Sequence, residues 1–138
     1  MWGNRKRKVT RIDSLIGQNT EIQGNIVFTG GLHVDGKVEG SITAPHDSGA
    51  ILTLSEQGSI RGDVRVPNVI LNGLVVGNVY AEEQVELALN ARIIGNVYYK
   101  LIEMAMGAEV NGSLVHSSEV ANQPALPLGY EKENSNES

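Results

Sequence analysis

The feature of this sequence that most restricts its fold is a short repeat built from glycine and alternating aliphatic residues. In the copy at Gly73–Val79, two glycines lie four positions apart and an aliphatic residue follows each glycine two positions later. Six copies can be recognised, and their second glycines are Gly24, Gly40, Gly62, Gly77, Gly95 and Gly112. The five intervals span 88 residues, which gives a mean repeat of 17.6 residues. A unit this short cannot bury its own apolar face, so the repeat is typical of a solenoid.

Aliphatic residues in each copy alternate with other residues, as in a β-strand that has one inward face. Aligning the copies makes four columns: Ile22, Val38, Ile60, Val75, Ile93, Val110; Ile26, Ile42, Val64, Val79, Val97, Leu114; Leu32, Leu52, Val69, Val85, Ile102; and Val34, Leu54, Leu71, Leu87, Met104. The spacings of three and four residues expected of an amphipathic helix do not occur in these columns. The pattern predicts an all-β, single-stranded parallel β-helix of about six turns, each turn hydrogen-bonded to its neighbours.

Composition agrees with a narrow coil and excludes several other classes of protein. The 138 residues include one Phe, one Trp and four Tyr, which are few aromatic rings for an ordinary globular core. Cysteine is absent, so disulfides and thiolate metal sites are excluded. The sequence has no phosphate-binding loop motif, no apolar run long enough to span a membrane and no secretory signal. We therefore expect a cytoplasmic protein with no catalytic residue, no cofactor and no metal.

The chain divides into three segments. We predict that residues 1–12 form a basic, flexible membrane-targeting tail, that residues 13–117 form the β-helix, and that residues 118–138 form a disordered tail rich in Pro, Asn, Ser and Glu. The net charge of −5 is unevenly placed, because the first segment carries +5 and the remainder carries −10. Such asymmetry usually indicates a tail that has a partner of its own.

The basic tail has the composition of a membrane-surface anchor. Its candidate lipid-binding residues are Met1, Trp2, Arg5, Lys6, Arg7 and Lys8. Tryptophan prefers the headgroup region, and each cation contributes about 1 kcal/mol at an anionic surface, so one copy binds weakly. A solvated charge run and a nucleic-acid contact are the alternatives. The strongly acidic remainder of the chain argues against nucleic acid, because phosphates would be repelled.

Several polar groups need no functional interpretation. Residues 44–49 form an inserted loop that explains the longest repeat, and the neighbouring His46, Asp47 and Ser48 cannot form a catalytic triad because they are adjacent in sequence. Glu82, Glu83 and Glu86 are expected to be a solvated acidic face. Asn78 and Asn96 occupy the same position in neighbouring repeats, and either a hydrogen-bonded ladder or two unrelated turn residues would explain them.

The two ends of the predicted coil are the candidate functional site. A β-helix end exposes unpaired backbone groups and apolar side chains, and solenoids normally cover it with a capping element. No capping helix is recognisable here, and Ile16 has the spacing of a partial turn before the first repeat. We predict a polymerisation interface that contains Ile16, Ile22 and Ile26 at one end and Val110 and Leu114 at the other. The residues do not decide whether like or unlike ends join.

Three runs of this sequence closely resemble the bactofilins, a family of bacterial cytoskeletal proteins. They are Asp13–Gly17, Ile22–Ile26 and Gly30–Gly40, and the resemblance extends over about residues 13–116. It implies a right-handed β-helix between flexible tails and non-polar filaments that form end to end without nucleotide. It also implies a scaffold at the inner face of the cytoplasmic membrane for cell shape, cell-wall synthesis or protein positioning, with cell-wall enzymes or other clients as partners. Many members carry Phe where this chain has Val110.

Two other interpretations remain open at this point. A left-handed β-helix acyltransferase of the hexapeptide-repeat type has a coil of similar length, but it requires strict six-residue periodicity and a catalytic histidine, for which His33 is a poor candidate. A membrane-recruited adaptor that stays monomeric is the other interpretation. Filament formation without nucleotide would separate the predicted polymer from both.

Overall fold

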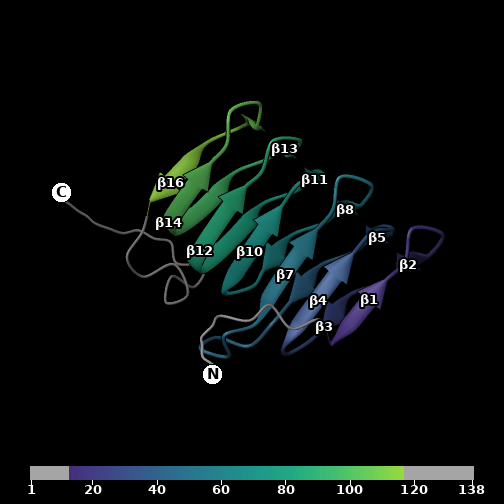
Figure 1. Cartoon of the computed structure of the whole chain (residues 1–138). Coiled ribbons are helices and arrows are strands. Elements are labelled where there is room, and N and C mark those ends of the chain that lie inside the picture. The colour runs from purple at the N-terminus through teal and green to yellow at the C-terminus, as the bar shows by residue number, and fades with distance from the viewer. Residues whose placement is uncertain (1–12, 117–138) are drawn as a thin grey trace, which may run out of the picture.

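A computed structural model describes residues 13–116, and every regular element in this range is a short β-strand (Figure 1). The predicted tails, residues 1–12 and 118–138, lie outside the described residues. The strands are β1 (Ser14–Ile16), β2 (Glu21–Gln23), β3 (Ile26–Val27), β4 (Gly31–Val34), β5 (Lys37–Glu39), β6 (Ile42–Thr43), β7 (Ile51–Leu54), β8 (Ser59–Arg61), β9 (Val64–Arg65), β10 (Asn68–Leu71), β11 (Leu74–Val76), β12 (Val79–Leu87), β13 (Arg92–Ile94), β14 (Val97–Met104), β15 (Glu109–Asn111) and β16 (Leu114–His116).

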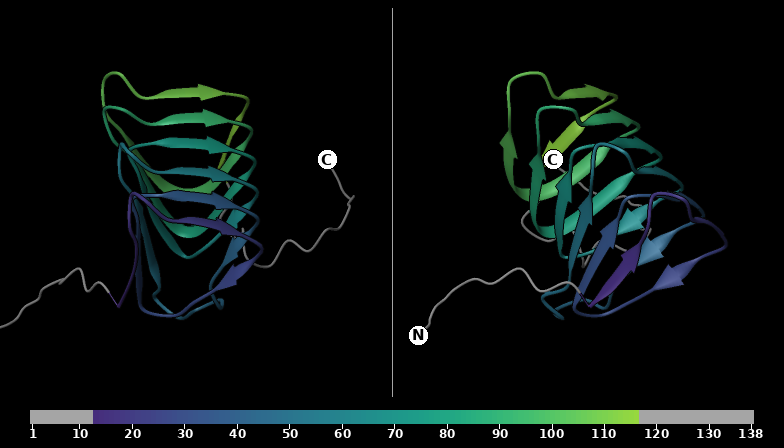
Figure 2. Two further views of the ribbon diagram at one scale, coloured as in Figure 1. Left: turned by 90° about the vertical axis from the view of Figure 1, so that its right-hand side faces the viewer. Right: turned by 45° about the vertical axis from the view of Figure 1, so that its right-hand side comes forward.

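The chain winds through six turns, and each turn contributes a strand to each of three walls (Figure 2). The first wall contains β1, β4, β7, β10 and the later parts of β12 and β14. The second wall is a six-stranded sheet in the order β15-β13-β11-β8-β5-β2. The third wall contains β3, β6, β9, the earlier parts of β12 and β14, and β16. Neighbouring strands are parallel in all of these walls, as the sequence predicted for a β-solenoid.

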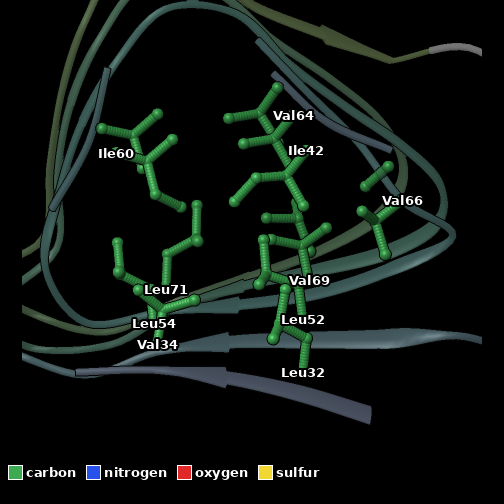
Figure 3. Packing of buried hydrophobic residues seen from close by; sticks show 14 of the residues in the cluster. Leu32, Val34, Ile42, Leu52, Leu54, Ile60, Val64, Val66, Val69 and Leu71 are labelled. Atoms are coloured by element: carbon green, nitrogen blue, oxygen red, sulfur yellow. The ribbon is translucent and has the colours of Figure 1, made fainter. Parts of the chain in front are cut away.

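The backbone register confirms the four predicted columns. In the second wall, for example, Val38 pairs with Ile60 and Val75 pairs with Ile93. The column side chains of the inner turns point into the coil and form one buried core (Figure 3). Ile16 pairs with Val34, so β1, β2 and β3 make one full turn, where the sequence spacing predicted only a partial turn before the first repeat.

The structure adds a fifth inward column, which the sequence did not indicate. It follows the third wall and contains Phe28, Ala44, Val66, Ala81, Tyr99 and His116. The three central residues are small or β-branched and are buried, whereas Phe28 and Tyr99 are only partly buried near the two ends of the coil. Residues of such different size share no pattern, which is why alternation alone did not reveal this column.

The glycine repeat forms the corner between the second and third walls. The second glycines of the repeats have φ between 135° and 156°, a region that favours glycine. A Cβ on Gly77 would overlap the carbonyl oxygen of Gly62 in the turn beneath, and the other inner glycines of this corner are equally confined. The next residue bonds along the same edge, because the N–H of Asn96 donates to Oδ1 of Asn78 at 3.0 Å and the N–H of Ser113 donates to Oδ1 of Asn96 at 3.0 Å. The asparagine ladder is therefore confirmed, in a side-chain-to-backbone form.

Candidate assembly interfaces

The last turn of the coil opens part of the apolar core to the outside. Met104 and Leu114 are 46% and 44% exposed, whereas Leu87 and Val97, their equivalents one turn earlier, are 0% exposed. Val110 and Ile102 are partly buried in the same turn. The predicted interface residues Val110 and Leu114 therefore lie on one face, which we call the C-terminal face. Ile102 and Met104 belong to this face as well. Both are members of the apolar columns, so the sequence pattern could have placed them in the predicted interface.

The first turn forms a second and less open face, which we call the N-terminal face. Ile22 and Ile26 are partly buried there, and Phe28 lies beside them. Ile16 is in the same turn, but its side chain is only 8% exposed, so it offers little surface to a partner. Ser14 stands where later turns have leucine or valine. The structure thus brings the predicted residues together at two opposite faces of unequal apolar character.

Both faces also leave strand edges available. β2 and β15 are the terminal strands of the second wall, and each pairs with a strand on one side only. Within residues 13–116 no helix covers either end. Open β-edges next to exposed core side chains are a template for a further turn from another chain, because that chain could satisfy the backbone groups and bury the side chains together.

The predicted membrane-binding residues Met1, Trp2, Arg5, Lys6, Arg7 and Lys8 lie outside the described residues. In the described part of the chain, no helix has the length and apolar character that crossing a membrane requires.

One expectation about surface charge is wrong. Glu82 is not part of a solvated acidic face, because its side chain is 13% exposed and holds the inserted loop. Its Oε2 lies 2.6 Å from His46 Nδ1 and accepts a hydrogen bond from the backbone N–H of Asp47 at 3.0 Å. The loop lies 35 residues away in sequence, so the composition of the acidic segment could not indicate this contact.

Comparison with known proteins points in the same direction as the geometry. The sequence model of the bactofilin family, described as polymer-forming cytoskeletal, matches residues 14–115. The chain is 31% identical to Bactofilin BacP of Myxococcus xanthus over 100 residues, which is 72% of this chain and 40% of that protein. It is 28% identical to Bactofilin BacO of the same organism over 109 residues, which is 79% of this chain and 83% of that protein.

The chain therefore spans less than half the length of the first of these relatives and most of the second. No solved structure gives a significant match. The region that the family shares is the coil, and it includes both open faces.

Proposed function

Because this chain belongs to the bactofilin family of polymer-forming cytoskeletal proteins, we propose that it joins end to end through its two open faces and builds filaments. The observation that carries the proposal is the pair of coil ends, neither of which is capped by an element within residues 13–116. Residues that are fully buried in the inner turns have equivalents in the last turn that are almost half exposed. Joining two faces gives those side chains the neighbours that the coil lacks at its ends.

The proposed assembly needs no nucleotide. Burying an aliphatic side chain stabilises a contact by about 1.5–3 kcal/mol, and each face carries several such side chains. Pairing of open strand edges adds backbone hydrogen bonds, which fix the orientation of one face against the other. We further propose that like faces meet, so that the filament is non-polar. Support for this part comes from the family alone.

We also propose that the filaments serve as a scaffold at the inner face of the cytoplasmic membrane. Residues 1–12 carry five basic residues and no acid, together with Trp2. One such tail binds anionic lipid weakly, but a filament displays many tails on one surface, and avidity makes their combined binding strong. A scaffold of this kind would position cell-wall enzymes or other client proteins and would act in cell shape or wall synthesis without catalysing a reaction itself.

Electron microscopy and sedimentation of the purified chain without nucleotide test the polymer directly. We expect long filaments from the wild type. In Leu114→Arg a charge would be buried at the junction, at a cost of about 3 kcal/mol or more, so the high-speed pellet should be lost while the coil remains folded. Val110→Arg should behave in the same way.

Leu89→Arg is the matched control, because Leu89 is 61% exposed on a side corner of the coil and not on an end face. Filaments that survive in both Leu114→Arg and Val110→Arg would rule out the C-terminal face as a junction. A wild-type protein that stays monomeric at high concentration would favour the monomeric adaptor.

Liposome sedimentation tests the membrane part separately. Deleting residues 1–8 should abolish co-pelleting with anionic vesicles and leave filaments intact, because the coil that the structure describes begins only at residue 13. Vesicles made only of neutral lipid provide the control. Undiminished binding of the truncated chain to anionic vesicles would exclude the tail as the anchor.

A further inference from the structure

The outer surface of the second wall carries an ordered pattern of charge. Each strand of this wall points its middle residue inward and its two flanking residues outward, so the wall displays two parallel rows along the coil. From the first turn to the last, the first row contains Glu21, Lys37, Ser59, Leu74, Arg92 and Glu109. The second row contains Gln23, Glu39, Arg61, Val76, Ile94 and Asn111. The six strands stack directly above one another (Figure 2, left).

We propose that this wall is a second interface between copies of the chain, through which two filaments pair side by side with their subunits parallel and their turns in register. The inference rests on the proposed end-to-end polymer. It concerns a different surface of the molecule from the two end faces.

Charge complementarity carries the proposal. When two copies face each other about a twofold axis along the coil, the first row of one copy lies opposite the second row of the other, turn for turn. Lys37 then faces Glu39 of the other copy, and Glu39 faces its Lys37. Two turns further on, Leu74 faces Val76, so an apolar contact lies beyond the ion pairs in the same interface. No two like charges lie opposite each other in this arrangement.

The antiparallel arrangement with full overlap is unfavourable. Each row would then face its own counterpart in reverse order, which places Glu21 opposite Glu109 and Lys37 opposite Arg92. Like charges placed directly opposite across an interface are costly and exclude the wrong pairing. Among the arrangements with full overlap, the distribution of charge over the wall therefore selects the parallel one.

The other walls do not offer a comparable pattern. On the third wall, the rings of Tyr80 and Tyr98 stack at 4.8 Å with an interplanar angle of 4°, and the Arg65 guanidinium lies 4.0 Å from the Tyr80 centroid. These ring faces are already occupied within the chain. One outward row of the first wall has two acidic residues, Glu86 and Glu103, in its last turns. If two copies met through this wall, no outward cation would face these carboxylates.

The size of the wall explains why pairing follows polymerisation. Six strands at about 4.8 Å and three residues per strand give about 300 Å² per subunit. A stable pair of free proteins needs about 800 Å² per partner. A single pair of subunits is therefore too weak to persist, but a filament whose subunits all turn this wall to the same side repeats the contact in every subunit and gains avidity. Filaments thus pair where free subunits do not.

Charge reversal combined with two-speed sedimentation of the full-length chain tests the proposal. Single filaments sediment only at high speed, whereas paired and bundled filaments also sediment at low speed. We expect Glu39→Lys and Lys37→Glu each to reduce the low-speed fraction about tenfold, because like charges then face each other in every subunit. The double variant Lys37→Glu/Glu39→Lys should recover it, because the two charges are exchanged and complementary again.

Two controls accompany these variants. Glu86→Lys makes the same kind of change on the first wall and should leave pairing unaltered. Thermal melting of each variant confirms the fold. This control is needed because Lys37 lies beside Glu21 and Glu39 lies beside Arg61 within one chain, and both of these contacts remain altered in the double variant. Raising the salt from 0.1 M to 1 M shortens the screening length from about 10 Å to about 3 Å and should release single filaments from wild-type pairs.

Recovery in the double variant, with single filaments in both single variants, supports the parallel interface. Wild-type pairing in Glu39→Lys would overturn it. Recovery of the low-speed fraction only when Lys37→Glu is combined with Glu109→Lys would also overturn it, because that result indicates an antiparallel pair shifted by one turn. Wild-type polymer in the high-speed pellet with none at low speed would overturn the lateral interface alone. Absence of protein from both pellets would overturn the end-to-end polymer together with it.

Discussion

At the scale of single residues, the corner glycines set the limits of the fold. The glycines at the corner of the second and third walls combine a φ that favours glycine with a carbonyl oxygen of the turn beneath where a Cβ would lie. Gly24 is the exception, because its φ is 135° but nothing lies within 4 Å of its Cβ position. The first turn has no turn beneath it. The Cβ position is therefore open at Gly24, whereas it is blocked at the equivalent glycines of the later turns.

This difference predicts unequal effects of alanine at two equivalent glycines. Gly77→Ala should lower the free energy of unfolding by about 3 kcal/mol or more, because backbone strain and overlap with the Gly62 carbonyl act together. Gly24→Ala should cost about 1–2 kcal/mol, since only the strain applies. Denaturant unfolding in the monomeric Leu114→Arg/Ile26→Arg background would measure both without interference from contacts between subunits. Equal losses would contradict the role assigned to the stacked carbonyls.

Asp35 makes the stability of the coil depend slightly on pH. The pKa of Asp35 is lowered below its usual 3.8, mainly by a hydrogen bond from the Ser55 side chain. Partial desolvation raises this pKa, and the nearby His33 ring lowers it. His33 Nε2 lies 2.9 Å from Asp35 Oδ1. Because the pKa is lower in the folded state, the charged carboxylate stabilises the fold above about pH 4, and this contribution is lost as the pH falls through the folded pKa.

We therefore expect wild type to exceed Asp35→Asn in stability at pH 6 and to lose that advantage toward pH 3. The difference should be below about 1 kcal/mol, because the pair is partly exposed and screened by solvent. Thermal unfolding across this pH range measures it. Ser55→Ala should reduce the advantage, since it removes the main cause of the lowered pKa. An advantage that grows on acidification would contradict the assignment.

Sequence reasoning succeeded wherever one residue type recurred at one position. Ile60, Val75 and Ile93 share an inward position because each follows a glycine or its substitute by two, so alternation was enough to place them. It failed where position depends on the shape of a corner. The different side chains of Phe28, Ala44 and Tyr99 share one column only because the third wall bends at the same place in each turn. Likewise, Ile16 is less exposed than its terminal position suggested.

At the scale of elements, the inserted loop is tied to a distant strand. Residues 44–50 separate β6 from β7, and Glu82 in β12 contacts both His46 and the backbone of Asp47. β12 has a register shift between Ala81 and Gln84, where it turns from the third wall into the first. This irregularity includes the position of Glu82. A sequence pattern of separate short strands did not indicate a strand that continues around the corner.

Removing this tie should open the loop without unfolding the coil. Glu82→Gln keeps an acceptor for the Asp47 N–H but loses the charge beside His46, so local opening should become about tenfold more frequent. A protease that cleaves after acidic residues would report the change as faster cutting at Asp47, with an unchanged melting temperature. Glu83→Gln, at the neighbouring exposed residue, is the control and should cut at the wild-type rate. Equal rates in both variants would show that Glu82 does not hold the loop.

At the scale of the whole molecule, the two end faces decide the symmetry of the polymer. If like faces join, blocking one face leaves the other able to form a closed twofold pair, whereas unlike-face joining leaves only monomers. We expect Leu114→Arg to stop at a dimer joined by N-terminal faces. Ile26→Arg should stop at a dimer joined by C-terminal faces, and the double variant should be monomeric. Sedimentation equilibrium distinguishes these states, and monomers in both single variants would show that the filament is polar.

The inserted loop also gives an otherwise uniform rod a periodic marker. Six turns at about 4.8 Å make each subunit about 29 Å long, and the exposed residues 45–49 protrude once per subunit, nearer to its N-terminal face. A polar filament would display these protrusions at a constant interval of about 29 Å. A filament of alternating subunits would space them unevenly, short across one junction and long across the next, and double its axial period to about 58 Å. The layer lines of its diffraction pattern therefore record the orientation of every subunit.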